Sequence, residues 1–276
     1  MKNTVKMVRI ERKNTEQDCI DFLQRAGVSN MYLYEGLGTH HPLFRNYCLQ
    51  KGDDIIGVLH TKNSKYLHLF LAAETDHTIV HGVAQHILKK FPRFEMLFGD
   101  EKSVYLYFKG CGRKPTHTVR FIFMEVDHTR FTPRVRHRGE IPSVQDAHLL
   151  LPLQIQYEIE EVGAIRAHID DKKVLQVMEK KIKRGEISAI FDGETPVALA
   201  GVNARFERCC QIGSVYVLPG YRGKGYGYSI VSYHIGRLFK RYDRIVLFVH
   251  ERNEAALHIY EKLGFERTDR LIQAYC

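Results

Sequence analysis

The chain has 276 residues, of which 44% are hydrophobic and 26% are charged, which is the balance of a globular protein. Its length exceeds that of one usual domain, so we expect two domains that build their cores without disulfide support. The formal net charge of +9 favours polyanionic ligands, namely nucleic acid, an acidic membrane or a phosphate-rich cofactor, without deciding among them.

The six cysteines show neither C-x-x-C spacing nor a disulfide framework, and they indicate reduced thiols in a cytoplasmic protein. The N-terminal stretch is basic but has no apolar core, so it is not a secretory signal, and no apolar run is long enough to span a bilayer. The basic clusters are not accompanied by a helix-turn-helix, zinc-finger or RNA-binding pattern. We therefore expect neither nucleic acid nor a membrane as a partner.

Histidines are concentrated in the first half of the chain, at His40, His41, His77, His81 and His86. His77 and His81 are four residues apart and can share a helix face. They lack the H-E-x-x-H pattern and a nearby cysteine pair, so surface or core roles are favoured and no metal site is expected.

The second half of the chain predicts an α/β fold with a mixed sheet. Apolar residues at helical spacing predict helices over 146–163, 171–185, 228–242 and 253–264. Strands are predicted over 186–206 (a hairpin that turns at Asp192 and Gly193), 210–218, 244–250 and 271–276. Helices followed by antiparallel strands and then by a strand–helix–strand–helix run indicate an α/β sandwich.

Segments of the first half match segments of the second. Aligning Gly52 with Gly193 gives an offset of 193 − 52 = 141, and aligning Thr78 with Ser229 gives 229 − 78 = 151. The first half is thus about ten residues shorter, where the second half carries LPGYRGKGYG. Two explanations account for these matches: the first half is a degenerate repeat that lacks the glycine loop, or two βα units resemble each other by chance. We place an N-terminal α/β domain at 1–132 and a C-terminal domain at 133–276, because a polar run begins at Pro133.

The glycine-rich stretch VYVLPGYRGKGYGYSI, residues 215–230, joins a predicted strand to a predicted helix. It is not a Walker A loop, because Gly225 rather than Ser or Thr follows Lys224, and it is not a Rossmann fingerprint, because Tyr228 stands where glycine is needed. The remaining pattern, R-x-x-G-x-G from Arg222 to Gly227, brings backbone N–H groups and a helix N-terminus to one place. It predicts a pyrophosphate site, and a mobile surface turn is the alternative.

This stretch and the later NEAALHIYEKLGF together resemble the GNAT superfamily of acyl-CoA-dependent N-acetyltransferases, over residues 134–276. The resemblance implies a GNAT-like fold for the C-terminal domain and acetyl-CoA as cosubstrate. It implies cofactor contacts from Val215 and Val217 of the strand, from Arg222, Gly223, Lys224, Gly225, Tyr226 and Gly227 of the loop, and from Asn253 of the later helix.

The resemblance also places Tyr260 near the acetyl thioester, where its phenol is expected to protonate the departing thiolate. Many members of the family carry a glutamate base on the strand before the loop, but Gln211 and Ser214 occupy that region here. Glu158 and Glu161, three residues apart on one helix face, are the expected replacements, and a solvated acidic face is the alternative.

We therefore expect an N-acetyltransferase that moves an acetyl group from acetyl-CoA to a primary amine of a small molecule or peptide by direct attack. The alternatives are a non-catalytic acyl-CoA-binding sensor or interaction module, and a nucleic-acid-binding protein. The sequence leaves the acceptor open, and also whether the protein is a monomer or a homodimer.

Overall fold

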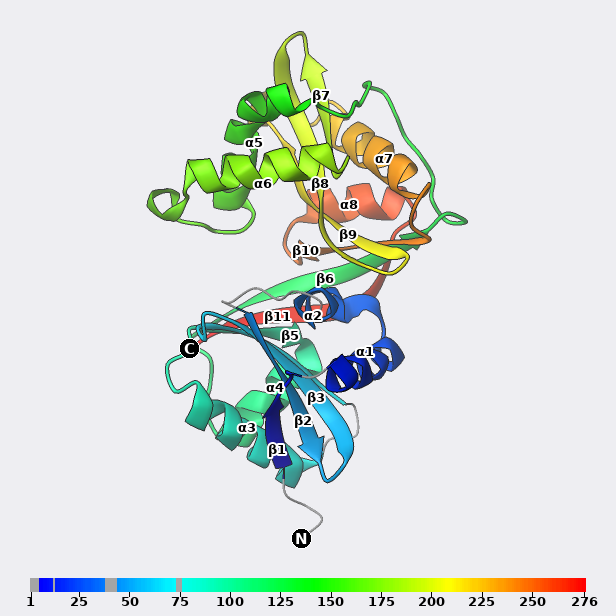
Figure 1. The fold of residues 1–276 in the computed structure, drawn as a ribbon. Coiled ribbons are helices and arrows are strands. Elements are labelled where there is room, and N and C mark those ends of the chain that lie inside the picture. The colour runs from blue at the N-terminus through cyan, green and yellow to red at the C-terminus, as the bar shows by residue number, and fades with distance from the viewer. Residues whose placement is uncertain (1–4, 12, 38–43, 73–75) are drawn as a thin grey trace. The chain divides into compact units, whose positions relative to one another are not determined.

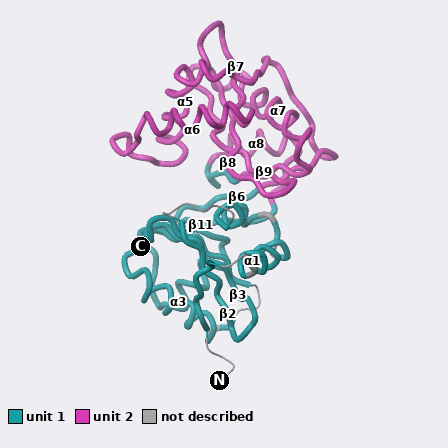
Figure 2. The backbone as a smooth tube through the Cα atoms, in the orientation of Figure 1, with its two compact units in different colours: residues 1–123, 248–252, 268–276 teal, residues 124–247, 253–267 magenta. Residues whose placement is uncertain are grey.

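The computed structural model describes residues 5–11, 13–37, 44–72 and 76–276, and His40 and His41 lie outside these ranges. The chain has the predicted mixed α/β fold (Figure 1). It divides into two compact units (Figure 2). Unit 1 comprises Met1–Phe123, Phe248–Arg252 and Thr268–Cys276, and unit 2 comprises Met124–Leu247 and Asn253–Arg267.

The first half of the chain has the element order β-α-α-β-β-β-α-β-α-β. These elements are β1 (Val5–Arg9), α1 (Lys13–Ala26), α2 (Met31–Leu37), β2 (Phe44–Lys51), β3 (Asp54–Lys62), β4 (Tyr66–Leu71), α3 (His77–Lys90), β5 (Met96–Asp100), α4 (Glu101–Cys111) and β6 (His117–Asp127).

The sheet of unit 1 has the strand order β1-β2-β3-β4-β5-β11, in which β11 is Glu266–Tyr275. Strands β2, β3 and β4 are antiparallel, β4 and β5 are parallel, and Leu271–Tyr275 of β11 pairs antiparallel with β5. Leu59 of β3 packs in one apolar core with Val83 of α3 and Tyr107 of α4. The next side chain, His60, points to the other face, where it lies against Gly36 of α2. Helices therefore cover both faces of this sheet.

The second half repeats the order α-α-β-β-β-α-β-α-β. Its elements are α5 (Ala147–Glu160), α6 (Asp171–Lys183), β7 (Ile187–Asp192), β8 (Thr195–Phe206), β9 (Cys209–Val217), α7 (Tyr226–Leu238), β10 (Arg244–His250), α8 (Glu254–Lys262) and β11. Short 3-10 turns span Val28–Asn30, Val144–Asp146, Arg166–His168 and Pro219–Tyr221.

Strands β7, β8 and β9 of unit 2 are antiparallel, and β9 and β10 are parallel. Successive side chains of a strand point to opposite faces of the sheet. Ile187 and Ala189 accordingly pack against α5 and α6, and the intervening Ser188 bonds His234 of α7 at 2.8 Å. Helices α5 and α6 thus lie on one face of this sheet and α7 lies on the other, so helices cover both faces as they do in unit 1.

The strand order supports the repeat suggested by the sequence. In both halves three antiparallel strands are followed by a parallel neighbour, and Gly52 and Gly193 hold matching hairpin turns with φ of +63° and +60°. The division at 132 and 133 stays a prediction, because the compact units are defined by contacts and interleave along the sequence.

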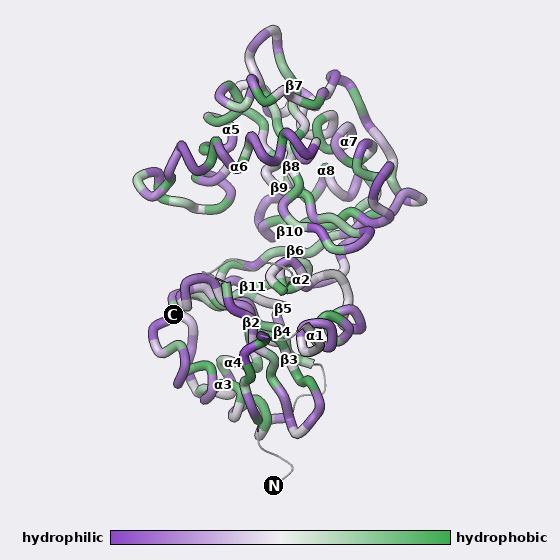
Figure 3. The backbone as a smooth tube through the Cα atoms, viewed as in Figure 1, coloured by the Kyte–Doolittle hydropathy of each residue, from purple (hydrophilic) through white to green (hydrophobic). Residues whose placement is uncertain are grey.

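Amphipathic patterning explains most helices (Figure 3). Helix α6 buries Met178 and Ile182 while lysines occupy its outer face, and Asp170 caps its N-terminus by accepting a hydrogen bond from Lys173 N at 3.2 Å. In the part of the chain that is described, no helix has the length and apolarity needed to cross a membrane.

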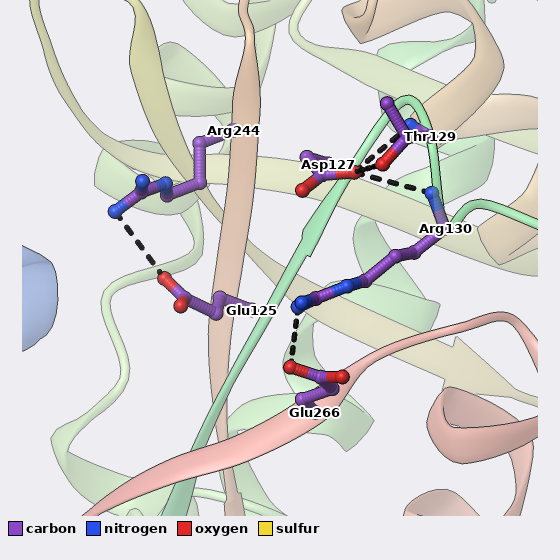
Figure 4. Close-up of polar contacts among 6 residues, drawn as sticks. All are labelled: Glu125, Asp127, Thr129, Arg130, Arg244 and Glu266. Carbon is purple, nitrogen blue, oxygen red and sulfur yellow. Dashed lines mark hydrogen bonds and ion pairs between the residues drawn. The ribbon is translucent and has the colours of Figure 1, made fainter.

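The turn after β6 in unit 2 is held by side chains that the sequence does not mark (Figure 4). Asp127 Oδ1 accepts hydrogen bonds from the N–H groups of Thr129 (2.9 Å) and Arg130 (3.1 Å), and Arg130 forms an ion pair with Glu266 of β11. Glu125 of β6 forms an ion pair with Arg244 of β10, with 3.5 Å between charged atoms. Both pairs fix the end of β6 to strands of the C-terminal half.

Gly264 adjoins this turn and ends α8 with φ +97°, and its neighbours Leu263 and Phe265 are buried. A Cβ at Gly264 would lie 2.1 Å from the carbonyl oxygen of Arg130. We expect Gly264→Ala to lower the free energy of unfolding by about 3 kcal/mol or more, because it adds a backbone clash to left-handed strain. Urea denaturation followed by circular dichroism measures this loss.

The matched control is Gly193→Ala, at φ +60° with no atom within 4 Å of the added Cβ. It carries the left-handed strain alone and should cost about 1–2 kcal/mol. Equal losses in the two variants would contradict the clash at Arg130.

Candidate active site

Strands β9 and β10 part within unit 2. They pair at three positions, where Cys209, Cys210 and Gln211 face Arg244, Ile245 and Val246, and β9 then continues to Val217. Ser214 has φ +49°, and the pairing of β9 with β8 shifts between Leu199 and Gly201, which marks a β-bulge. The edge of β9 that contains Val215 and Val217 therefore has no described partner on the β10 side.

The glycine loop follows β9 directly. Gly223 and Gly225 have φ of +75° and +89°, a conformation that glycine adopts without steric cost. Gly225 is the N-cap of α7, and no side chain caps this helix. The first N–H groups of α7 are thus left without intrahelical or side-chain partners, beside the positive end of the helix dipole. Gly227 lies where a Cβ would be 2.9 Å from Ile259 of α8, so it allows the two helices to approach.

The two cations of the motif are already engaged. Arg222 Nε donates to Val217 O at 2.9 Å, and a terminal nitrogen of its guanidinium donates to Glu160 Oε2 at 2.7 Å. Lys224 Nζ donates to Gly220 O at 2.8 Å. The side chains of Arg222 and Lys224 therefore brace the loop, and its anion-binding capacity lies in the backbone.

A segment near the start of the predicted C-terminal domain crosses the start of α7, and we call residues 134–140 the strap. Ser229 Oγ accepts hydrogen bonds from the N–H groups of Arg136 (2.9 Å) and His137 (3.1 Å). The His137 ring stacks on Tyr226 with 3.7 Å between centroids and 8° between planes, and its Nε2 lies 3.0 Å from Lys224 O. The strap is thus anchored both to α7 and to the loop.

Helix α8 places Asn253 and Tyr260 beside the end of α5. Asn253 is the N-cap of α8, where its Oδ1 accepts from Ala256 N at 3.1 Å and its Nδ2 donates to Glu161 Oε2 at 3.3 Å. Tyr260 is 7% exposed, and burial raises the pKa of its phenol, with Tyr157 and Glu161 contributing further. The phenol therefore stays protonated at neutral pH.

At the end of α5, the carboxylate that contacts the glycine loop is Glu160. Glu158 Oε1 accepts from Gln154 at 2.8 Å, and Glu161 bonds Asn253. Glu160, which was not predicted, accepts from Tyr216 OH at 2.6 Å and from Arg222. The bond from Tyr216 and then the bond from Arg222 lower the pKa of Glu160, while burial and the bond to Glu160 raise the pKa of Tyr216 to about 12.

Helical periodicity could have identified Glu160. Leu153 and Tyr157 pack in one cluster with Tyr216, and Glu160 follows them at helical spacing on the same face. No sequence signal reveals the strap contacts, because Ser229 lies more than ninety residues from its partners.

Two of the histidines in the first half, His81 and His86, lie within hydrogen-bond distance of backbone carbonyl oxygens. His81 Nδ1 lies 2.9 Å from Gly110 O, and His86 Nε2 lies 2.9 Å from Val5 O. Among the described residues, no group of three or more metal-ligating side chains is placed to hold an ion.

Replacing Glu160 by Gln should lower the stability of the protein at neutral pH, because the carboxylate has two charge-stabilising partners. The folded pKa lies below the unfolded value of about 4.3, so this stabilisation is present above that value and is lost as pH falls through the folded pKa. We expect a loss of only about 0.5–1 kcal/mol at pH 7, since the pair is partly exposed, and this loss should shrink as the pH falls. Urea denaturation at several pH values measures it.

Glu194→Gln in the exposed β7–β8 turn removes the same charge and serves as the control. A Glu160→Gln effect that equals this control, or that does not depend on pH, would contradict the stabilising role of the pair.

Comparison with known proteins finds one family model and several solved structures that are similar to this chain. The family model described as acetyltransferase (GNAT) family matches residues 156–265. An acetyltransferase from the GNAT family of Colwellia psychrerythraea is 13% identical, with a TM-score of 0.64 and coverage of 98% of this chain and 99% of that chain. A GCN5-related N-acetyltransferase from Sphaerobacter thermophilus is 13% identical, with a TM-score of 0.67 and coverage of 98% and 95%.

A tandem GNAT protein from the clavulanic acid biosynthesis pathway is also 13% identical, with a TM-score of 0.61 and coverage of 98% of both chains. At these identities the likenesses concern the fold, and they extend over both halves of the chain. No curated protein matched the sequence. The sequence match to the acetyltransferase (GNAT) family thus covers residues 156–265, within the C-terminal half of the chain.

Proposed function

We propose that the protein is an N-acetyltransferase that transfers an acetyl group from acetyl-CoA to a primary amine of a small molecule or peptide. The match of residues 156–265 to the acetyltransferase (GNAT) family model supports acyl transfer in general. The observation that carries the finer proposal is the parted edge of β9 leading directly into the uncapped N-terminus of α7.

These two features fit the two chemical parts of coenzyme A. The pantetheine arm carries amides, which can add to an open strand edge as a further strand does, and Val215 and Val217 supply that edge. The pyrophosphate is an anion suited to the N–H groups of residues 223–227 and the dipole of α7. Asn253, held between α8 and Glu161, would line the same space from the other side.

The chemistry follows from the buried phenol and the acidic end of α5. An amine nitrogen attacks the thioester carbonyl, the carbon–sulfur bond breaks, and the phenol of Tyr260 gives its proton to the departing thiolate. The backbone N–H groups of β9 near Val215 can stabilise the developing oxyanion. Glu158 and Glu161 are the proposed acceptors of the proton that the amine loses.

The first half of the chain is proposed to lack a cofactor site. At the N-terminus of α3, the carboxylate of Asp76 accepts from Ile79 N at 3.0 Å, so a negative charge occupies the position that Gly225 leaves open on α7. β4 and β5 pair through Leu69 and Gly99, where a Cβ on Gly99 would lie 2.3 Å from Leu69 O. Strands β4 and β5, which are equivalent to β9 and β10, therefore stay paired at this position. We accordingly expect one cofactor site per chain.

Acetyl-CoA should raise the melting temperature of the protein, because a ligand that binds only the folded state stabilises it by about 2.7 kcal/mol at a hundred times its Kd. Thermal unfolding with and without acetyl-CoA, followed by thiol release in the presence of a panel of amines, tests the proposal. The absence of any stabilisation would overturn it. Stabilisation without thiol release for any amine would favour the non-catalytic sensor instead.

Tyr260→Phe should lower kcat by about 10²-fold or more while the KM for acetyl-CoA changes by less than about twofold, because the variant loses only the proton donor. Steady-state thiol release with the best amine of the panel measures both constants.

Tyr242→Phe, at another buried tyrosine of unit 2, is the matched control and should retain the wild-type kcat. An unchanged kcat in Tyr260→Phe would reject the role of Tyr260 as acid.

A further inference from the structure

The cations around the glycine loop differ in what holds them. Arg222 and Lys224 are committed to Glu160, Val217 O and Gly220 O. Arg136 of the strap is exposed, and its guanidinium has no ion pair or hydrogen bond among the residues that the structure describes. Its charge is therefore available to a ligand.

The position of Arg136 is fixed by its own backbone. The Arg136 N–H donates to Ser229, a fully buried residue of α7, and the neighbouring His137 is stacked on Tyr226 and bonded to Lys224 O. The Arg136 side chain then runs beside the N-cap of α7, with its Cδ 3.3 Å from where a Cβ on Gly225 would stand. A guanidinium carried by this stem lies within reach of an anion bound at the helix N-terminus.

We propose that Arg136 binds a phosphate group of the coenzyme at the N-terminus of α7, so that the strap, outside the matched residues 156–265, completes the cofactor site. Guanidinium groups pair with phosphates through two parallel N–H···O bonds, which strengthens binding beyond that of a point charge. This inference rests on the proposed function and deepens it. The phosphate can belong to the pyrophosphate or to the 3′-phosphate of the ribose, and the experiment separates the two.

The experiment measures the Kd of CoA by calorimetry for the full chain and for the variants Arg136→Ala and Arg136→Lys. We expect Arg136→Ala to raise the Kd about tenfold, which corresponds to the loss of one charge-assisted contact, and Arg136→Lys to restore part of the affinity. The difference should shrink at high salt, because the contact lies near solvent. If Arg136→Ala loses affinity for CoA but not for 3′-dephospho-CoA, Arg136 contacts the 3′-phosphate. If it loses affinity for both ligands, Arg136 contacts the pyrophosphate.

Arg134→Ala is the matched control. Arg134 belongs to the same strap, and its replacement by Ala removes the same charge. Its backbone, however, is anchored at Ser232, about one helical turn beyond Ser229. The Kd of Arg134→Ala for CoA should stay within about twofold of the wild-type value. Without ligand, Arg134→Ala and Arg136→Ala should have equal melting temperatures, because both side chains are exposed. A wild-type Kd in Arg136→Ala, or equal losses in the two variants, overturns the role of Arg136. A wild-type chain that binds no CoA overturns the proposed function itself.

Discussion

Strands β9 and β10 pair through three residues of each strand and then part, so that among the described residues the later backbone of β9 has no partner on that side. An unpaired strand edge inside a domain is unfavourable unless something supports it. Tyr216 supplies that support by packing against Leu153 and Tyr157 of α5 and bonding Glu160. Glu160 in turn accepts a hydrogen bond from Arg222 of the glycine loop. The open edge of β9, helix α5 and the glycine loop are therefore connected by these contacts.

The two halves of the chain differ at the N-terminus of the helix that follows their third antiparallel strand. Both have the same strand order and the same helix after the third antiparallel strand. The helix N-terminus is neutralised by Asp76 in one half and left open by Gly225 in the other. Because the positive end of a helix accepts either its own carboxylate or a bound anion, this difference in the cap residue is what the proposed function relies on to assign the phosphate to α7 and not to α3.

Much of unit 2 could be predicted from its sequence because the signals there are local. The hairpin turn at Gly193, the strand over 244–250 and the glycine loop each depend on neighbouring residues, and the structure confirms them. Helix α7 begins two residues earlier and ends four residues earlier than predicted, since helical periodicity does not mark the end residues. The strap was missed for another reason: it acts through contacts with Ser229, which lies far along the chain. The predicted roles of Tyr260, Glu158 and Glu161 remain predictions, because position and protonation do not by themselves demonstrate catalysis.

The pairing of Leu271–Tyr275 with β5 has a consequence for how the protein is made. The paired residues Gly99 and Ile272 are 272 − 99 = 173 residues apart, so this contact closes late during synthesis. Until then β5 presents an open edge to any other strand that it meets, including one from a second nascent chain. The unit whose sequence is translated first is therefore the one whose sheet is finished last.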